Sequence, residues 1–411
     1  MPTVLLTLAF VLVAAKLAGE LLERLGQPAV LGELLVGICL GNLARLGGPA
    51  VTGVAHNETL VVLAELGAIL LLFHVGLEST PREMLAVGGR AALVAAVGVV
   101  TPMLLGFGVG ELLRPGESWM FHGFLGGMLA ATSVGITARV LKDAGALKTP
   151  FARLILGAAV IDDVLGLLVL AVISGVVTAA GSGQALSFDA ILLIGLKAFV
   201  FLAGALVIGS FLSPRVFHAA LALRSTGVVQ ALALSFCFTL SYLALKAGLA
   251  PIVGAFAAGL VLEEVHFEGH VERGERPLHD SLEPLIALFV PVFFVRMGML
   301  VDVRSFADAS VLGFAAVLTL AAILGKLACA AATPKGMSGL TVGLGMMPRG
   351  EVGLIFAGIG AQLVLEGRPV VDAGAYAAAV FMVVATTMAT PPLLLWAMRR
   401  SRTIASGALQ S

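Results

Sequence analysis

Charged residues are scarce in this chain of 411 residues, because Asp, Glu, Lys and Arg together make up only 12% of it. Soluble globular proteins carry about twice that share, roughly 25%. With so few charged side chains, the chain cannot cover a soluble fold of this size with polar surface. The charges that are present balance, with 25 basic and 25 acidic residues. No basic excess points to a nucleic-acid partner, and we expect none.

Cysteine is also scarce, and this limits the kinds of site to consider. The three cysteines, Cys39, Cys237 and Cys329, each lie in an apolar stretch. Their spacing matches no metal-ligand pattern, so we interpret them as small core residues. We expect no cofactor and no enzymatic site.

Apolar sequence, in contrast, is abundant, with hydrophobic residues forming 59% of the chain. Runs of about 20 apolar residues recur from end to end, and at ~1.5 Å per residue each can cross ~30 Å of hydrocarbon. The 50 glycines are typical of helices that pack closely in lipid. We therefore predict an all-α polytopic membrane protein with about thirteen transmembrane helices. The predicted spans are 3–23, 28–43, 59–77, 88–112, 119–141, 150–178, 189–212, 226–247, 249–265, 283–301, 306–331, 337–364 and 371–398.

The distribution of Lys and Arg predicts the orientation in the membrane. If the N-terminus lies outside and the spans alternate, the inner connections hold fifteen Lys and Arg and the outer ones five. Cytoplasmic loops are enriched in these residues. We expect a protein of the cell inner membrane with its N-terminus outside and a cytoplasmic tail, 399–411.

An internal repeat is visible at an offset of 222 residues. The stretch GQPAVLGELLVGICL, residues 26–40, overlays GLAPIVGAFAAGLVL, residues 248–262, with three glycines and a leucine matched, and Gly76 falls on Gly298. The matched spans are seven apart, and an odd displacement reverses their direction through the membrane. The sequence therefore predicts two inverted-topology repeats, a construction typical of secondary transporters.

Two adjacent acids, Asp162 and Asp163, lie in the middle of the sixth span, LILGAAVIDDVLGLLVLAVISG. An acid at the bilayer centre costs about 2.5–3.5 kcal/mol on insertion scales, so both need a cation, a proton or water. Consecutive helical residues point about 100° apart. One carboxylate can therefore meet a permanent partner while the other faces a cavity. A purely structural ion-pair cluster is the alternative, although it explains the second acid poorly.

Lys326 is the matching cation, deep in the eleventh span, LAAILGKLACAA. A pair with an aspartate would offset the cost of burying both charges. The alternative is a lysine whose amine reaches the headgroups, which is more usual near helix ends.

Two spans carry residues that interrupt a helix. The fifth, GGMLAATSVGITARVL, has Thr132 and Ser133 in its middle, and the twelfth, GLGMMPRGEVGLIFAGIG, has Pro348, Arg349 and Glu351. Interrupted helices at equivalent places in two halves indicate a transport site. Freed carbonyls and the two hydroxyls could bind a small hard cation, while the charges of Arg349 and Glu351 could offset the partial charges of half-helix ends. Two ordinary kinks are the alternative.

Seven segments, together with the adjacent aspartates, carry a resemblance to a known family: 24–42, 63–79, 131–141, 157–172, 291–299, 323–327 and 348–357. On these segments the chain resembles the monovalent cation:proton antiporter-2 family, in particular bacterial sodium/proton antiporters with a double-aspartate motif. The resemblance implies a dimer with two broken helices that cross in a mobile core, which slides against a scaffold in an elevator motion. The implied domains are a scaffold of 1–87 and 226–304, a core of 88–180 and 305–398, and a linker helix within 181–225.

The resemblance also assigns roles to single residues. Asp163 matches the acid that carries the ion and the proton, Asp162 matches the acid that pairs with a lysine, here Lys326, and Thr132 matches the residue at the first helix break. Relatives with electroneutral exchange tend to have asparagine and arginine in place of this aspartate and lysine. The chain is therefore expected to be electrogenic. Arg296 departs from the family pattern and could compete for Asp162.

These observations predict exchange of sodium or lithium for protons, with two protons per cation. Three alternatives stay open: a potassium/proton antiporter, a sodium-coupled symporter of an organic anion on a related fold, and a passive cation channel. Nothing in the sequence resembles a selectivity filter, which disfavours the channel.

Overall fold

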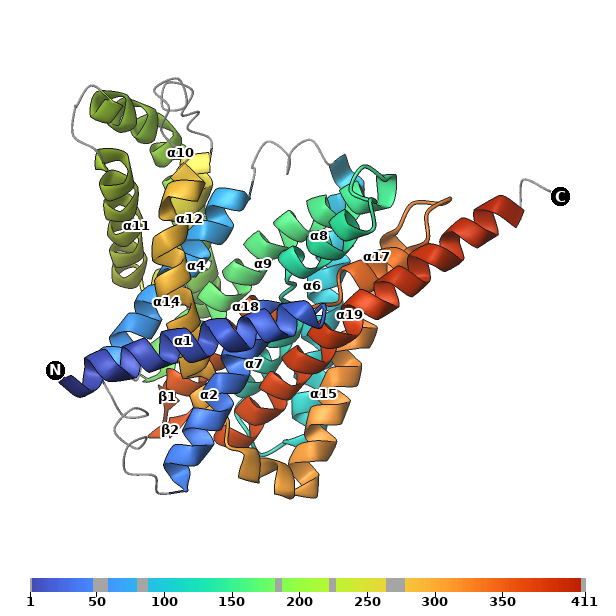
Figure 1. Cartoon of the computed structure of the whole chain (residues 1–411), viewed down its shortest axis with the longest axis horizontal. Coiled ribbons are helices and arrows are strands. Elements are labelled where there is room, and N and C mark those ends of the chain that lie inside the picture. Colours follow the sequence, from blue (N-terminus) through green and yellow to red (C-terminus); the bar gives the residue numbers. More distant parts are fainter. Residues whose placement is uncertain are drawn as a thin grey trace. The chain divides into compact units, whose positions relative to one another are not determined.

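The computed structural model describes residues 2–46, 58–79, 88–181, 187–221, 227–263 and 278–407 (Figure 1). These ranges are helical apart from short connections and one two-stranded hairpin, β1 (Val364–Leu365) with β2 (Arg368–Pro369). Parts of the predicted linker, 182–186 and 222–225, and of the predicted tail, 408–411, lie outside the described residues.

Fewer transmembrane spans are counted from the lengths of the helices than the thirteen predicted from the sequence. Among the described residues, ten helices are long and apolar enough to cross a membrane, or eleven if the bent pair α17 (Gly339–Gly345) and α18 (Gly350–Gln362) counts as one. Each of the thirteen predicted segments coincides with helix, but α2 (Ala29–Arg45) has 17 residues and α12 (Pro251–Glu263) has 13. The described α12 side chains are almost all buried. The predicted span 249–265 is longer than this helix, and residues 264 and 265 lie outside the described residues.

The chain divides into two compact units, of which the first comprises Met1–Pro81 and Ser174–Leu300. It contains the helices predicted as scaffold together with the predicted linker helix. Their roles stay predictions. Besides α2 and α12, the helices of this unit are α1 (Pro2–Arg24), α4 (Glu58–Glu78), α10 (Phe188–Leu221), α11 (Val228–Lys246) and α14 (Leu278–Leu300).

Two glycine contacts relate the halves of this first unit. A Cβ on Gly37 of α2 would lie 2.9 Å from Cα of Gly298 in α14, and a Cβ on Gly76 of α4 would lie 2.9 Å from Cα of Gly259 in α12. The offset of 222 residues turns the first contact into the second. Small residues let helix backbones approach this closely in lipid. The repeat predicted from sequence is thus present in the packing of this unit.

The second unit comprises Arg82–Ile173 and Val301–Ser411. The long helix α9 (Pro150–Gly181) belongs mainly to this unit, and its last residues belong to the first. Besides α17 and α18, the other helices are α6 (Gly88–Leu113), α7 (Trp119–Ala130), α8 (Val134–Asp143), η1 (Val303–Ala307), α15 (Ala309–Leu327), α16 (Cys329–Ala332) and α19 (Ala373–Gly407).

Both predicted interruptions are present in this second unit. The chain is extended at Ser133, with φ −100° and ψ 104°, between α7 and α8. Helices α17 and α18 are bent by 49° at their break. Gly350, at the start of α18, has φ +41°, and a Cβ there would collide with the side chain of Ser133. Only glycine fits this conformation and this approach without strain.

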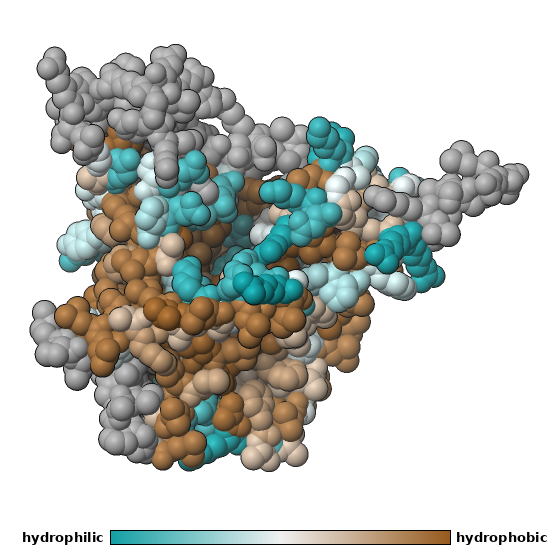
Figure 2. All heavy atoms as spheres, in the orientation of Figure 1, coloured by the Kyte–Doolittle hydropathy of each residue, from teal (hydrophilic) through white to brown (hydrophobic). Residues whose placement is uncertain are grey.

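The surface is apolar over wide areas, as a lipid-facing surface requires. Figure 2 shows hydrophobic residues in brown over much of the visible face, including α1. Large apolar side chains are exposed along two helices. They include Leu6, Phe10 and Leu17 on α1, and Leu192 and Phe199 on α10. In water such surfaces would aggregate.

Candidate ion-binding site

Asp162 of α9 and Lys326 of α15 form an ion pair in the interior of the second unit. The Lys326 ammonium donates a hydrogen bond to Oδ1 of Asp162 over 2.7 Å, and both side chains have 0% exposure. Taking two charges out of water is expensive, and a good hydrogen-bonded geometry is what compensates it. Each charge therefore depends on the other.

The second carboxylate oxygen of Asp162 is not bonded in this way. Oδ2 is buried and has no hydrogen-bond partner among the described residues. The Thr132 hydroxyl and the Arg349 guanidinium lie near enough to act on the Asp162 charge. A buried carboxylate oxygen without a partner is costly, and it is available to a cation.

Asp163 is in a different setting from its neighbour. Its exposed fraction is 9%, against 0% for Asp162. Adjacent positions on α9 point about 100° apart, so only one of the two carboxylates is directed at Lys326. The structure thereby separates the two acids into a fully enclosed one and a more accessible one.

Helix α6 passes close to the ion pair at Gly98. A Cβ at this position would lie 3.4 Å from Oδ1 of Asp162, 3.4 Å from Nζ of Lys326 and 3.1 Å from Sγ of Cys329. The absence of a side chain at Gly98 leaves the room that the pair occupies. Sequence reasoning missed this residue, because one glycine in a glycine-rich span carries no distinguishing signal.

The two helix breaks contact each other directly. The Ser133 amide donates to the carbonyl of Pro348 over 2.8 Å, and the Thr132 hydroxyl donates to the carbonyl of Met346 over 3.4 Å. The Thr137 hydroxyl donates to the carbonyl of Gly345 over 2.6 Å. Backbone groups that lose their helical partners at one break are thus bonded from the other, as the lipid environment demands.

Arg349 links the first break to the helix that carries Lys326. Its fully buried guanidinium donates to the carbonyls of Ala131, over 3.0 Å, and of Ala322, over 2.8 Å. Ala131 caps the C-terminal end of α7, where partial negative charge gathers. Ala322 lies one turn before Lys326 in α15. Arg349 therefore fixes the position of α15 against the break.

A second contact between the breaks involves a carboxylate. The Ser133 hydroxyl donates to Oε2 of Glu351 over 2.9 Å, and Glu351 lies in the first turn of α18, where an acid is favourable. Ser133 and Glu351 differ by 218 residues, as do Ala131 and Arg349. Two contacts with the same spacing along the chain therefore join the two breaks.

Seven of the eight predicted site residues belong to the second unit, and six of them have the contacts described above. Arg296, predicted as a competitor for Asp162, lies in α14 of the first unit, so its role stays a prediction. The second cation that acts on Asp162 is Arg349. Sequence reasoning also missed Thr387 of α19, whose hydroxyl accepts a bond from the Gly350 amide over 3.4 Å. A run of threonines in an apolar span, at 386, 387 and 390, was the available signal.

The donor set does not match a transition-metal site. Among the described residues, no group of three or more His, Cys, Asp or Glu is arranged to hold a metal ion. The groups gathered here are the Asp162 carboxylate, hydroxyls and carbonyl oxygens, with Asp163 next to Asp162 on α9. Oxygen ligands of this type bind alkali cations at the broken helices of transporters.

Comparison with known proteins agrees with this geometry. The curated relatives include the high-affinity Na⁺/H⁺ antiporter NhaS3 of Synechocystis sp., 39% identical over 95% of this chain and 89% of that protein. They also include the Na⁺/H⁺-K⁺ antiporter GerN of Bacillus cereus, 36% identical over 94% of both. The fold is that of the sodium proton antiporter MjNhaP1 of Methanocaldococcus jannaschii, with a TM-score of 0.70, 18% identity and 99% of both chains covered.

The match to a family model extends over nearly the whole chain. The model described as "Sodium/hydrogen exchanger, transmembrane" matches residues 8–396, which include both helix breaks, Asp162, Asp163 and Lys326. That range together with the relatives shows that the chain is a multi-pass membrane transporter and belongs to the sodium/hydrogen exchanger family.

Proposed function

We propose that this protein exchanges sodium or lithium for protons across the membrane. In this proposal Asp163 binds the cation and a proton in alternation, while Asp162 alternates between Lys326 and the cation. The observation that carries this proposal is the buried Asp162–Lys326 pair, which lies next to Asp163 in the unit where two helix breaks contact each other. The relatives named above, described as Na⁺/H⁺ antiporters, support it.

Coupling follows from the electrostatics of the two acids. A protonated Asp163 is neutral and inexpensive to move within the membrane, whereas the ionised form needs a cation beside it. A sodium ion that binds Asp163 therefore displaces its proton. Thr132 and Ser133, at the first break, are in place to supply oxygen ligands.

The second proton is assigned to Lys326. A cation that also binds the free Oδ2 of Asp162 weakens the attraction that keeps Lys326 charged. Burial disfavours an ammonium without a partner, so the lysine releases a proton. Two protons then exchange for one cation, and the cycle moves net charge. Arg349 keeps its carbonyl partners throughout and holds the break in place.

The two units fit a division into scaffold and core. The first unit contains backbone-to-backbone glycine contacts, and the second contains the ion site and both breaks. We assign the elevator movement to the second unit and dimerisation to the first. The assignment to the antiporter-2 branch and the orientation with the N-terminus outside belong to the same proposal.

Proton-linked flux in proteoliposomes tests the proposal. A sodium gradient should drive proton movement in the parent protein, and Asp163→Asn should abolish it, because the amide cannot exchange a proton. Asp143→Asn is the matched control, since Asp143 ends α8 of the same unit and is exposed. An Asp163→Asn protein with full exchange would refute the assignment.

Membrane potential tests the number of protons. When two protons exchange for one cation, net positive charge moves in the direction of the protons. A potential that favours this charge movement should therefore speed exchange by the parent protein, while Lys326→Gln should respond far less. A parent protein indifferent to voltage would remove the two-proton scheme and leave simple exchange at Asp163.

Potassium is the second candidate cation, because GerN is described as a Na⁺/H⁺-K⁺ antiporter. Oxygen ligands alone do not fix ion size. The same vesicles loaded with potassium, sodium or lithium in turn would rank the three ions. Membership of an exchanger family favours exchange over symport with an organic anion.

A further inference from the structure

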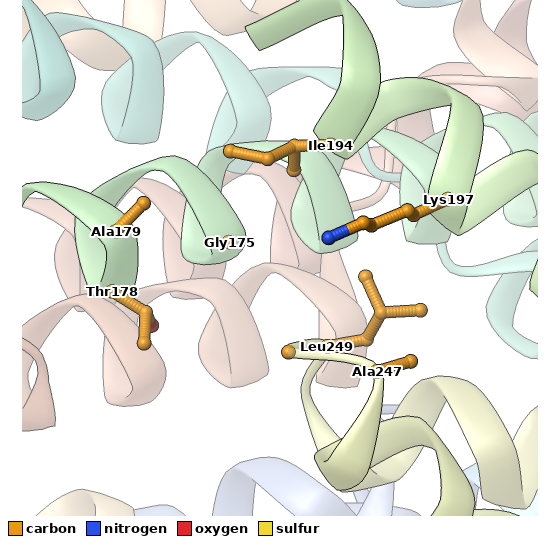
Figure 3. A pocket seen from close by; sticks show the side chains of 8 residues that line it. Gly175, Thr178, Ala179, Ile194, Lys197, Ala247 and Leu249 are labelled. Carbon is orange, nitrogen blue, oxygen red and sulfur yellow. The ribbon is translucent and has the colours of Figure 1, made fainter. Parts of the chain in front are cut away.

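The first unit contains a cavity that the exchange reaction does not use. Its volume is about 190 Å³, and it lies between the end of α9, the helix α10 and the turn that joins α11 to α12. The lining includes Gly175, Thr178 and Ala179 of α9, Lys197 of α10 and the turn 247–249 (Figure 3). It has the volume of several water molecules, which is room for a phosphate group.

Lys197 is the one charged residue that lines this cavity. Figure 3 shows its nitrogen extending into the space between Gly175 and Leu249. Its ammonium has no hydrogen-bond or ion-pair partner among the described residues, and no acid lines the cavity. A cation on an apolar helix without a counter-ion is costly in a membrane. The charge excludes a second cation site and calls for an anion.

The cavity lies near one end of the helices that form it. Residues 175–179 belong to the last two turns of α9, which ends at Gly181, and α11 ends at Lys246 immediately before the lining turn. Lys197 follows Asp189, in the first turn of α10, by eight positions, or about 12 Å. A lysine side chain shortens that depth by reaching toward the helix end.

A nearby aromatic residue places this end at the membrane–water boundary. The Lys246 ammonium lies 5.5 Å from the centre of the Tyr242 ring, and tyrosines and lysines gather at headgroup level. The α10 surface beside Lys197 is apolar and exposed at Leu193, Leu196 and Val200. A ligand here would therefore have its charged group in the cavity and hydrocarbon along α10.

From this arrangement we infer that the cavity binds the phosphodiester headgroup of an anionic phospholipid, with Lys197 as its counter-ion and the acyl chains along α10. The bound lipid contacts the end of α9, the helix that also carries Asp162 and Asp163. The inference concerns binding alone and does not depend on which cation the protein transports.

Native mass spectrometry of the full chain in detergent tests the site with phosphatidylglycerol and phosphatidylcholine as probes. The parent protein should retain phosphatidylglycerol in preference. Lys197→Met should weaken that binding about fivefold, which corresponds to the ~1 kcal/mol that one lysine contributes at an anionic membrane surface. Lys197→Arg should keep the preference. Equal phosphatidylglycerol binding by the parent and Lys197→Met would overturn the inference.

Lys246→Met is the matched control, since this lysine lies at the same end of the unit and does not line the cavity. Lys246→Met should retain the preference for phosphatidylglycerol. If Lys246→Met lost that preference and Lys197→Met kept it, the inferred site would also be overturned. Ala179→Trp fills the cavity and keeps the lysine, so it should weaken binding even if Lys197→Met fails to fold. Inorganic phosphate should not displace the lipid at millimolar concentration; displacement would show a site for the free anion and overturn the lipid assignment.

Discussion

Close packing holds each of the two units of this protein together, and the second unit adds polar contacts between its two helix breaks. In the first unit, α2 and α4 meet α14 and α12 through glycines whose backbones touch. In the second unit, two helix breaks are joined by hydrogen bonds from Ser133, Thr137 and Arg349. Close backbone packing has one good arrangement, because interiors are dense and resist deformation. Glycines bring backbones together in the second unit too, since a Cβ on Gly106 of α6 would lie 2.8 Å from Cα of Gly126 in α7. The difference between the units is therefore the set of hydrogen bonds that joins the two helix breaks of the second one.

Removing the charge of Lys326 should cause the largest loss of stability, and the loss should be in the second unit. Lys326→Met leaves Asp162 buried without its hydrogen-bonded counter-ion, and loss of one partner of a buried pair costs about 3–5 kcal/mol. Protonation of Asp162 would relieve that cost, so the loss should be largest at high pH. Thermal unfolding in detergent at several pH values measures both effects.

The double substitution Asp162→Asn with Lys326→Met is the control for that prediction. It removes both charges, so most of the stability lost in the single variant should return. A double variant as unstable as Lys326→Met would show that the lysine acts through packing, and not through its charge on Asp162.

The glycine contacts of the first unit should show equal losses at positions related by the repeat. Gly37→Ala and Gly259→Ala each place a methyl against the partner's backbone, which typically costs about 1–3 kcal/mol. Gly204→Ala on α10 is the control, since nothing lies within 4 Å of its Cβ, and it should be neutral or stabilising. Thermal unfolding of the three variants separates them. A large loss at only one of Gly37 and Gly259 would contradict the symmetric packing.

The sequence predicted the parts of this molecule that depend on strong local signals. Hydrophobic runs identify the helices, and charges in an apolar span, such as Asp162 and Lys326, are visible because they are costly there. Pro348 and the polar residues at 132–133 marked the breaks. The sequence did not predict the role of Gly98, where the lack of a side chain leaves room for the ion pair. A glycine of this kind cannot be told in the sequence from one that only allows two helices to pack closely. The length of α12 escaped as well, since hydropathy alone does not show where a short buried helix begins and ends.

Gly98 provides the smallest and most specific test of the comparison. Gly98→Ala adds a methyl 3.4 Å from both charged atoms of the Asp162–Lys326 pair and 3.1 Å from the Cys329 sulfur. The helix gains up to about 1 kcal/mol from losing a glycine, and crowding at the sulfur offsets much of it. The net change in stability should therefore be under about 1 kcal/mol. Gly108→Ala on the same helix, with nothing within 4 Å of its Cβ, should show the gain alone.

A substitution of Cys329 tests whether the methyl of Gly98→Ala destabilises the protein by crowding the Cys329 sulfur. Cys329→Ala removes the atom that the Gly98→Ala methyl crowds most. In a Cys329→Ala background, Gly98→Ala should therefore stabilise the protein by about as much as Gly108→Ala does in the parent protein. The same variants assayed for sodium-driven proton flux separate room from charge. If the methyl moves the ion pair, Gly98→Ala alters the sodium concentration needed for half-maximal exchange, and Cys329→Ala restores it. An unchanged sodium dependence in all three would show that the pair tolerates the methyl and that the space at Gly98 serves packing alone.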